Sequence, residues 1–168
     1  MLRGFQPRFQ PTGFQPVVVE FGKCIGAYLN AINLIGECKF DEAKDALNEA
    51  IKWNQVYWRE ADMPVGHHIT EECAIAAKPL LEAIKVAEMY HEARSLVNQQ
   101  KISEARGKIA LLLVFHSQTN FVVSIENLNQ HLNQRKGKPI NYSKYAKKTA
   151  DFYAHVAQRL LASISDSG

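Results

Sequence analysis

The amino-acid sequence predicts an all-α protein: a bundle of four to five helices made from a duplicated antiparallel helical hairpin, after an extended Pro- and Phe-rich N-terminal arm. Two observations support this fold class. Apolar residues recur at steps of three and four along most of the chain, which is the period of an amphipathic helix. The pattern of residues 28–50, which includes a helix–helix turn, recurs at residues 90–112. No segment shows the pattern expected of a strand.

The 168-residue chain is 46% hydrophobic and 22% charged, which is typical of one globular domain. A chain of this length buries enough surface to fold without disulfides or a metal. Its three cysteines are widely spaced and form no CxxC pair, so we expect free thiols in a reducing compartment. The apolar stretch from Ile109 to Ile125 is interrupted by the polar residues 116–120, so we expect no membrane-spanning helix.

The N-terminal arm, residues 1–16, contains the tripeptide Phe-Gln-Pro three times. Proline fixes its own φ and restricts the residue before it, so the arm is expected to be extended, close to polyproline II. Its phenylalanines, Phe5, Phe9 and Phe14, present a large apolar surface. The arm either covers a seam of its own bundle, docks on another subunit or is disordered.

The start of the chain has no apolar segment of the length that a signal peptide needs. We therefore predict a cytoplasmic protein. Mitochondrial import is the alternative, because Arg3 and Arg8 precede the first acidic residue, Glu20. The prolines of the arm oppose the amphipathic helix that an import signal forms.

Residues 17–168 are predicted to form a single helical-bundle domain, with the first hairpin over 17–61. Its first helix is expected to begin after Pro16 and to pack through a stripe at helical spacing: Val18, Phe21, Ile25, Tyr28, Ile32 and Ile35. The turn follows Gly36. The second helix is expected to begin with Asp41 as its N-cap, and its stripe includes Ala43, Leu47 and Ala50.

The second hairpin is predicted over 70–135. Its first helix contains Pro79, so the helix either kinks there or ends and starts again. The next helix is expected to begin with Ser103 as its N-cap and has a pattern that can extend to Arg135. The C-terminal helix is predicted over 143–164, with a packing face of five residues: Tyr145, Thr149, Phe152, Val156 and Leu160.

The two hairpins match residue by residue at a shift of 62. The matched pairs are Tyr28 with Tyr90, Ala31 with Ala93, Leu34 with Leu96, Ile35 with Val97, Ala43 with Ala105, and Leu47 with Ile109. The expected N-caps also coincide, which favours a duplicated helical hairpin.

Each hairpin resembles a tetratricopeptide-type helix pair. The family's small and apolar positions are occupied by Ala31, Leu34, Ala43, Leu47 and Ala50 in the first hairpin and by Ala93, Leu96, Ala105, Ile109 and Leu112 in the second. The resemblance implies a tightly packed helix pair and a binding role.

Positive charge is concentrated near the C-terminus. Residues 127–168 hold seven basic and two acidic side chains, whereas residues 20–126 hold 11 basic and 15 acidic ones. Six of the basic residues fall within the segment 135–148, which we call the basic segment: Arg135, Lys136, Lys138, Lys144, Lys147 and Lys148. Such a cluster is either a solvated surface or a contact for an acidic protein face, nucleic acid or anionic lipid.

Glu88 and His91 form an ExxH motif, which places a carboxylate and an imidazole on one helix face. In an antiparallel hairpin that turns near residue 101, His116 lies opposite position 86. Because helical bundles hold metals and tetrapyrroles between facing helices, these three residues are the alternative metal site. A di-iron site needs a second ExxH, which the sequence does not contain, so we expect no metal or cofactor.

These patterns predict a non-catalytic protein–protein interaction or assembly subunit of a larger complex. It would dock through the phenylalanines of the arm and through the basic segment. The expected partners are other protein subunits or further copies of the chain. The alternatives are a metal- or tetrapyrrole-binding bundle and a nucleic-acid-binding accessory protein. No catalytic motif is recognisable, so we do not expect an enzyme.

Overall fold

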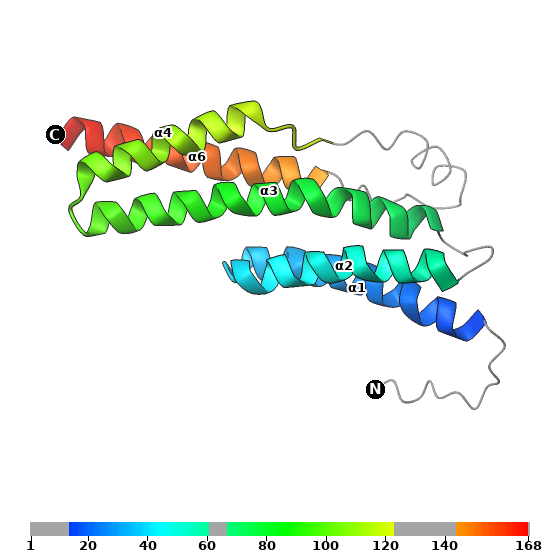
Figure 1. Cartoon of the computed structure of the whole chain (residues 1–168). Helices are drawn as coiled ribbons and strands as arrows, with labels where there is room; N and C mark the ends of the chain where they lie inside the picture. Colours follow the sequence, from blue (N-terminus) through cyan, green and yellow to red (C-terminus); the bar gives the residue numbers. More distant parts are fainter. Residues whose placement is uncertain (1–13, 61–66, 123–143, 168) are drawn as a thin grey trace.

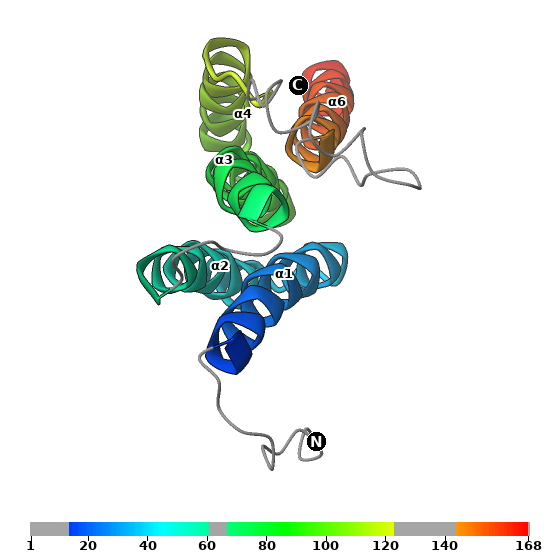
Figure 2. The same cartoon turned by 90° about the vertical axis from the view of Figure 1, so that its right-hand side faces the viewer.

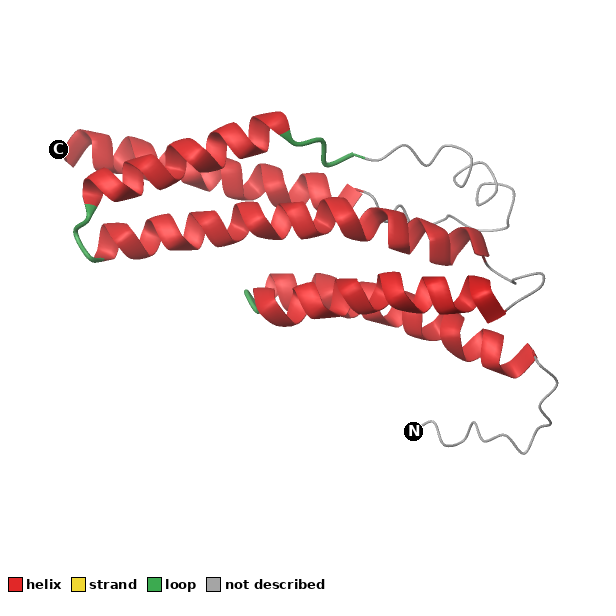
Figure 3. Ribbon diagram, in the orientation of Figure 1, coloured by secondary structure: helices red, strands yellow, loops and turns green. Residues whose placement is uncertain are grey.

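The structure, a computed structural model, describes residues 14–60, 67–122 and 144–167, and within these ranges every regular element is a helix (Figure 3). The elements are α1 (Phe14–Gly36), α2 (Phe40–Glu60), α3 (His67–Asn98), α4 (Ile102–Gln118) and α6 (Lys144–Ser167). The predicted all-α class is therefore confirmed.

The longest helix, α3, lies at the centre of the molecule (Figures 1 and 2). The antiparallel pair of α1 and α2 packs on one side of α3, and α4 and α6 pack on the other side. Helices α4 and α6 also contact each other. The bundle thus consists of two groups of three helices that share α3.

The core of the described residues is rich in alanine. Nearly half of its buried hydrophobic residues are alanines, five of them on α3: Ala76, Ala77, Ala83, Ala87 and Ala93. The largest fully buried side chains include Tyr28, Leu47 and Leu80. Small side chains at a contact allow helix axes to approach closely, so α3 can pack against neighbours on two sides.

The duplicated hairpin is confirmed by the two turns, which share one hydrogen-bond pattern. After α1, Cys38 N–H donates to Ile35 O (3.0 Å) and Lys39 N–H donates to Leu34 O (2.9 Å). After α3, the bonds from Gln100 to Val97 (2.9 Å) and from Lys101 to Leu96 (2.8 Å) lie 62 residues further on. This pairing is the Schellman motif, and the left-handed residue that it requires is Cys38 (φ 61°) or Gln100 (φ 63°).

The side chains buried by the two hairpins follow the same shift. All members of these pairs are buried: Cys24 and Val86, Tyr28 and Tyr90, Ala31 and Ala93, Ala43 and Ala105, Leu47 and Ile109, and Ala50 and Leu112. The repeat therefore extends from the turn into the core.

The predicted N-caps Asp41 and Ser103 are wrong. Helices α2 and α4 begin earlier, because the first helical bonds run from Ala43 N–H to Lys39 O and from Ala105 N–H to Lys101 O, both 3.0 Å. The Schellman turn leads straight into the next helix and leaves no room for a separate cap. Lys101 caps α4 through its backbone alone, without a side-chain hydrogen bond.

Three predicted boundaries also change. Helix α1 begins at Phe14, so Phe14 to Pro16 are helical rather than part of an extended arm. Proline is tolerated in the first turn of a helix because the N–H that it lacks would have no helical partner there. Helix α3 begins at His67 and continues through Pro79. Helix α4 ends at Gln118, where the extended backbone of Thr119 stops it, and does not continue to Arg135.

The predicted packing face of the C-terminal helix is confirmed only in part, because Tyr145, Val156 and Leu160 are partly buried against the core whereas Phe152 is not. Phe152 is 58% exposed, and the buried side of α6 is formed by small residues and one tyrosine: Ala146, Ala150, Tyr153, Ala154 and Ala157. The larger side chains fit the helical period equally well, but close packing against α3 and α4 favours the alanine face.

The strained turn predicts that Gln100→Gly raises the free energy of unfolding by up to about 1 kcal/mol. Glycine removes the Cβ clash of a left-handed residue, which costs roughly 1–2 kcal/mol, and this gain exceeds the added entropy of the unfolded chain. Urea denaturation followed by circular dichroism measures the change.

Gln99→Gly is the matched control for that experiment. Gln99 lacks a positive φ and donates from its side chain to Ser95 Oγ (3.0 Å), so this glycine should lower the stability. A loss of stability in Gln100→Gly comparable to that in Gln99→Gly would contradict the account of the turn.

Candidate functional site

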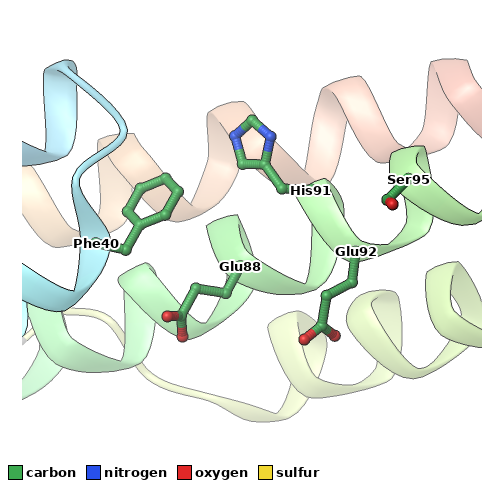
Figure 4. A pocket seen from close by; sticks show the side chains of 5 residues that line it. All are labelled: Phe40, Glu88, His91, Glu92 and Ser95. Atoms are coloured by element: carbon green, nitrogen blue, oxygen red, sulfur yellow. The ribbon is translucent and has the colours of Figure 1, made fainter.

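The ExxH motif lines a pocket on the surface of α3. Glu88 and His91 share this open pocket of about 400 Å³ with Phe40 from α2 and with Glu92 and Ser95 from α3 (Figure 4). Phe40 enters because the α1–α2 turn brings the start of α2 over α3. The structure therefore brings together two of the three residues of the alternative metal site.

The two carboxylates of the pocket are each paired with a lysine of a neighbouring helix. Lys44 Nζ on α2 donates to Glu88 Oε2 at 2.9 Å, and Lys108 Nζ on α4 lies 2.9 Å from Glu92 Oε1. The hydrogen bond to Glu88 raises the pKa of Lys44. These partly exposed pairs are each worth less than about 1 kcal/mol, but they neutralise the carboxylates.

His91 lies among aromatic rings at the edge of the pocket. Its ring centroid is 5.5 Å from that of Phe40, 5.3 Å from Tyr90 and 5.7 Å from Tyr153. Burial lowers the pKa of His91, and the positive charge of Arg94 lowers it further. The neutral imidazole is therefore favoured at pH 7.

His116 belongs to a different site. Its Nε2 lies 2.8 Å from Asp151 Oδ1 on α6, and its ring stacks on Phe121 at 5.7 Å between centroids. Glu88, in contrast, is paired with Lys44. Among the described residues, no group of three or more His, Cys, Asp and Glu side chains could hold a metal ion. The alternative metal site of Glu88, His91 and His116 is thus not assembled.

The basic segment is described in part. Arg135, Lys136 and Lys138 lie outside the described residues, as do Phe5 and Phe9 of the arm. The remaining members, Lys144, Lys147 and Lys148, are exposed in the first turns of α6. Lys147 Nζ donates to Asp151 Oδ2 at 2.6 Å, and Lys144 lies over the ring of Tyr145. Within the described part of the chain, Lys148 has no ion pair.

A second exposed row on α6 was not anticipated from the sequence. Lys148, Phe152, His155 and Arg159 are all exposed and follow one another at steps of four, three and four. This spacing places them on one face, which we call the α6 outer face. The alanines of α6 form a second stripe at helical spacing in the sequence. Because this stripe is the buried one, Phe152 points towards solvent.

The outer side of α4 is apolar and exposed. Ala105, Ile109 and Leu112 are buried as predicted, but Leu111 is 60% exposed and Val114 is 50% exposed. The sequence signal is the unbroken apolar run from residue 109 to residue 115, which puts apolar side chains on every side of the helix. A helix that is apolar all round is typically covered all round, whereas α3 and α6 cover only part of α4.

Comparison with known proteins gives no match, neither to a family model nor to a curated protein nor to a solved structure. The 62-residue repeat also differs from the 34-residue repeat of tetratricopeptide proteins. Within the described residues, none of the helices combines the length and apolar character that crossing a membrane requires.

The Asp151 interactions predict a pH-dependent contribution to stability. Burial alone would raise the pKa of Asp151, but hydrogen bonds from Lys147 and His116 outweigh it and hold the pKa below its ordinary value. The stabilisation is present above the unfolded-state pKa of about 3.9 and is lost as the pH falls through the lower folded-state pKa. Asp151→Asn should therefore lower stability by about 0.5 kcal/mol at pH 7 and by less near pH 2.

Urea denaturation at both pH values tests this expectation. Asp45→Asn is the control, since Asp45 is exposed on α2 and makes no ion pair within the described ranges. A difference between wild type and Asp151→Asn that stays constant with pH would show that charge is not the cause.

Proposed function

We propose that the chain is a non-catalytic protein-interaction or assembly subunit that binds its partner through the outer face of α4. The exposure of Leu111 and Val114, which lie three residues apart on one side of the helix, is the observation that carries the proposal. Isolated exposed apolar residues are ordinary, but neighbouring ones on an uncharged surface are typical of contact sites.

The outer face of α4 has no charged residue over its last three turns. At helical spacing it is formed by Gly107, Ala110, Leu111, Val114 and Gln118. A Cβ added to Gly107 would meet no atom within 4 Å, so this side of the helix is open. The surface fits an apolar, uncharged face of a partner helix. Full burial of a leucine or valine contributes roughly 1.5–3 kcal/mol, and about half of this remains available for Leu111 and Val114, which are 60% and 50% exposed.

The α6 outer face supports a second contact, of different chemistry. Lys148 and Arg159 make no ion pair with any described residue, and they flank the exposed ring of Phe152. A basic face around an aromatic side chain complements an acidic protein surface with an apolar depression. It continues the basic segment, for which we propose the same acidic partner.

We also propose that the N-terminal arm docks on the partner. Phe5 and Phe9 remain candidate anchors, while Phe14 is the first residue of α1. Deletion of residues 1–13 should weaken partner binding and leave the melting temperature nearly unchanged, because it removes no described helical residue. A large fall in melting temperature would mean that the arm belongs to the fold of the chain itself.

Native mass spectrometry of the protein purified from its natural source tests the proposal. We expect the wild type in a complex heavier than the 19.0 kDa chain, and the double variant Leu111→Gln/Val114→Gln released as a monomer. Because both side chains are already exposed, thermal unfolding of the variant should change little.

Leu29→Gln is the matched control, since Leu29 is 40% exposed on α1, away from the proposed face. It should leave the complex intact. A wild type that is monomeric, or a Leu29→Gln variant that dissociates as readily as the α4 variant, would contradict the role of α4.

A further inference from the structure

One of the three cysteines is accessible and lies against two ionisable side chains. Cys38 is exposed in the α1–α2 turn, whereas Cys24 and Cys73 are buried. The sulfur of Cys38 is 3.9 Å from Nε2 of His91 on α3 and 4.0 Å from the hydroxyl of Tyr153 on α6. Three separate elements therefore bring a thiol, an imidazole and a phenol together, and we call this group the Cys38 cluster.

Cys38 occupies a backbone position at which a glycine would be more stable. Cys38 is the left-handed residue of the Schellman turn (φ 61°), and the described residues form no such cluster around Gln100, the equivalent residue of the second hairpin. Strained residues that are held by the surrounding structure often serve a function. The turn fixes the backbone from which the thiol reaches His91.

Of the two neighbours of the thiol, His91 is suited to accept a proton and Tyr153 is suited to donate a hydrogen bond. Burial lowers the pKa of His91, so its imidazole is neutral at pH 7 and Nε2 can accept a proton in the appropriate tautomer. Burial also raises the pKa of Tyr153 to about 12, and the adjacent Cys38 contributes to this shift. The phenol therefore remains protonated and can donate a hydrogen bond to a thiolate.

His91 and Phe40 connect the Cys38 cluster to the pocket of about 400 Å³. Both carboxylates of this pocket are paired with lysines, so the pocket presents little net charge. Its aromatic side, formed by Phe40 and His91 (Figure 4), and its balanced charges fit a small, uncharged organic molecule.

We propose that Cys38 is a nucleophilic thiol, activated by His91, that forms mixed disulfides with small organic disulfides bound beside it. Nε2 of His91 removes the thiol proton, and the sulfur attacks one sulfur of the disulfide. The disulfide bond breaks, a bond between Cys38 and that sulfur forms, and the departing thiolate takes the proton from His91. Cys38 is oxidised to the mixed disulfide, and one half of the small disulfide is reduced and leaves as a free thiol.

The reaction of the full-length chain with dithiodipyridine, an uncharged disulfide whose thiol product absorbs light, tests the proposal. At pH 7 one thiol per chain should react rapidly, and Cys38→Ser should abolish this phase. His91→Gln should slow it by about tenfold or more, because the variant lacks the base. His155→Gln, which removes an exposed histidine of α6 outside the Cys38 cluster, is the control and should react at the wild-type rate.

The pH dependence separates activation from a structural effect. At high pH, hydroxide can remove the thiol proton without help from His91, so wild type and His91→Gln should approach the same rate. The His91→Gln variant leaves the other ionisable groups near the Cys38 cluster unchanged. These are Glu37 and Lys39 in the turn, Tyr90 and Arg94 on α3, and Tyr153 on α6.

Two results would overturn the proposal: equal rates for wild type and His91→Gln at pH 7, or a slowing by His91→Gln that is the same at every pH. Tyr153→Phe provides a second, independent test. It retains the buried ring and removes only the hydroxyl, so the rate at pH 7 should fall by a few-fold if the phenol stabilises the thiolate. An unchanged rate in this variant would remove Tyr153 from the mechanism.

Discussion

The burial of α3 on two sides is the constraint on which the rest of the structure depends. The helix packs against α1 and α2 in one group and against α4 and α6 in the other, and no other described helix belongs to both groups. Half of the buried hydrophobic residues of α3 are alanines, which let neighbouring helices approach closely from both directions. The ion pairs of Glu88 with Lys44 and of Glu92 with Lys108 connect the same helix to both groups. Helix α3 tolerates Pro79 because its packing on two sides compensates for the helical hydrogen bond that proline cannot donate.

This arrangement also determines which surfaces remain open. Since α4 and α6 lie at the edge of the described bundle, the other described helices cover only part of the circumference of each. The uncovered part of α4 is apolar, and that of α6 is basic with an exposed phenylalanine. Two chemically different faces on adjacent helices support the proposed role of binding partners of different character. The Cys38 cluster has a separate origin, since it forms where the first hairpin turn crosses α3 and reaches α6.

Much of the fold could be predicted from local patterns, and the exceptions have physical reasons. The three- and four-residue spacing located the helices, and the repeat located both turns, because each depends on residues close together in the chain. Phe152 was wrongly placed on the packing face of α6 because it fits the helical period as well as the alanines do, and only contact with α3 and α4 selects between them. The N-caps were wrong because the Schellman geometry made Lys39 and Lys101 the caps. Cys38 meets His91 and Tyr153 across 53 and 115 residues, which no local pattern specifies.

Native-state hydrogen exchange tests the central position of α3 most directly. If α3 joins the two groups of helices, its amides between residues 80 and 93 exchange only through global unfolding and have the highest protection in the chain. The buried amides of α1, α2, α4 and α6 should then show equal or lower protection. Core amides of the α1–α2 hairpin that are better protected than those of α3 would contradict this account, because that hairpin would then persist after α3 has unfolded.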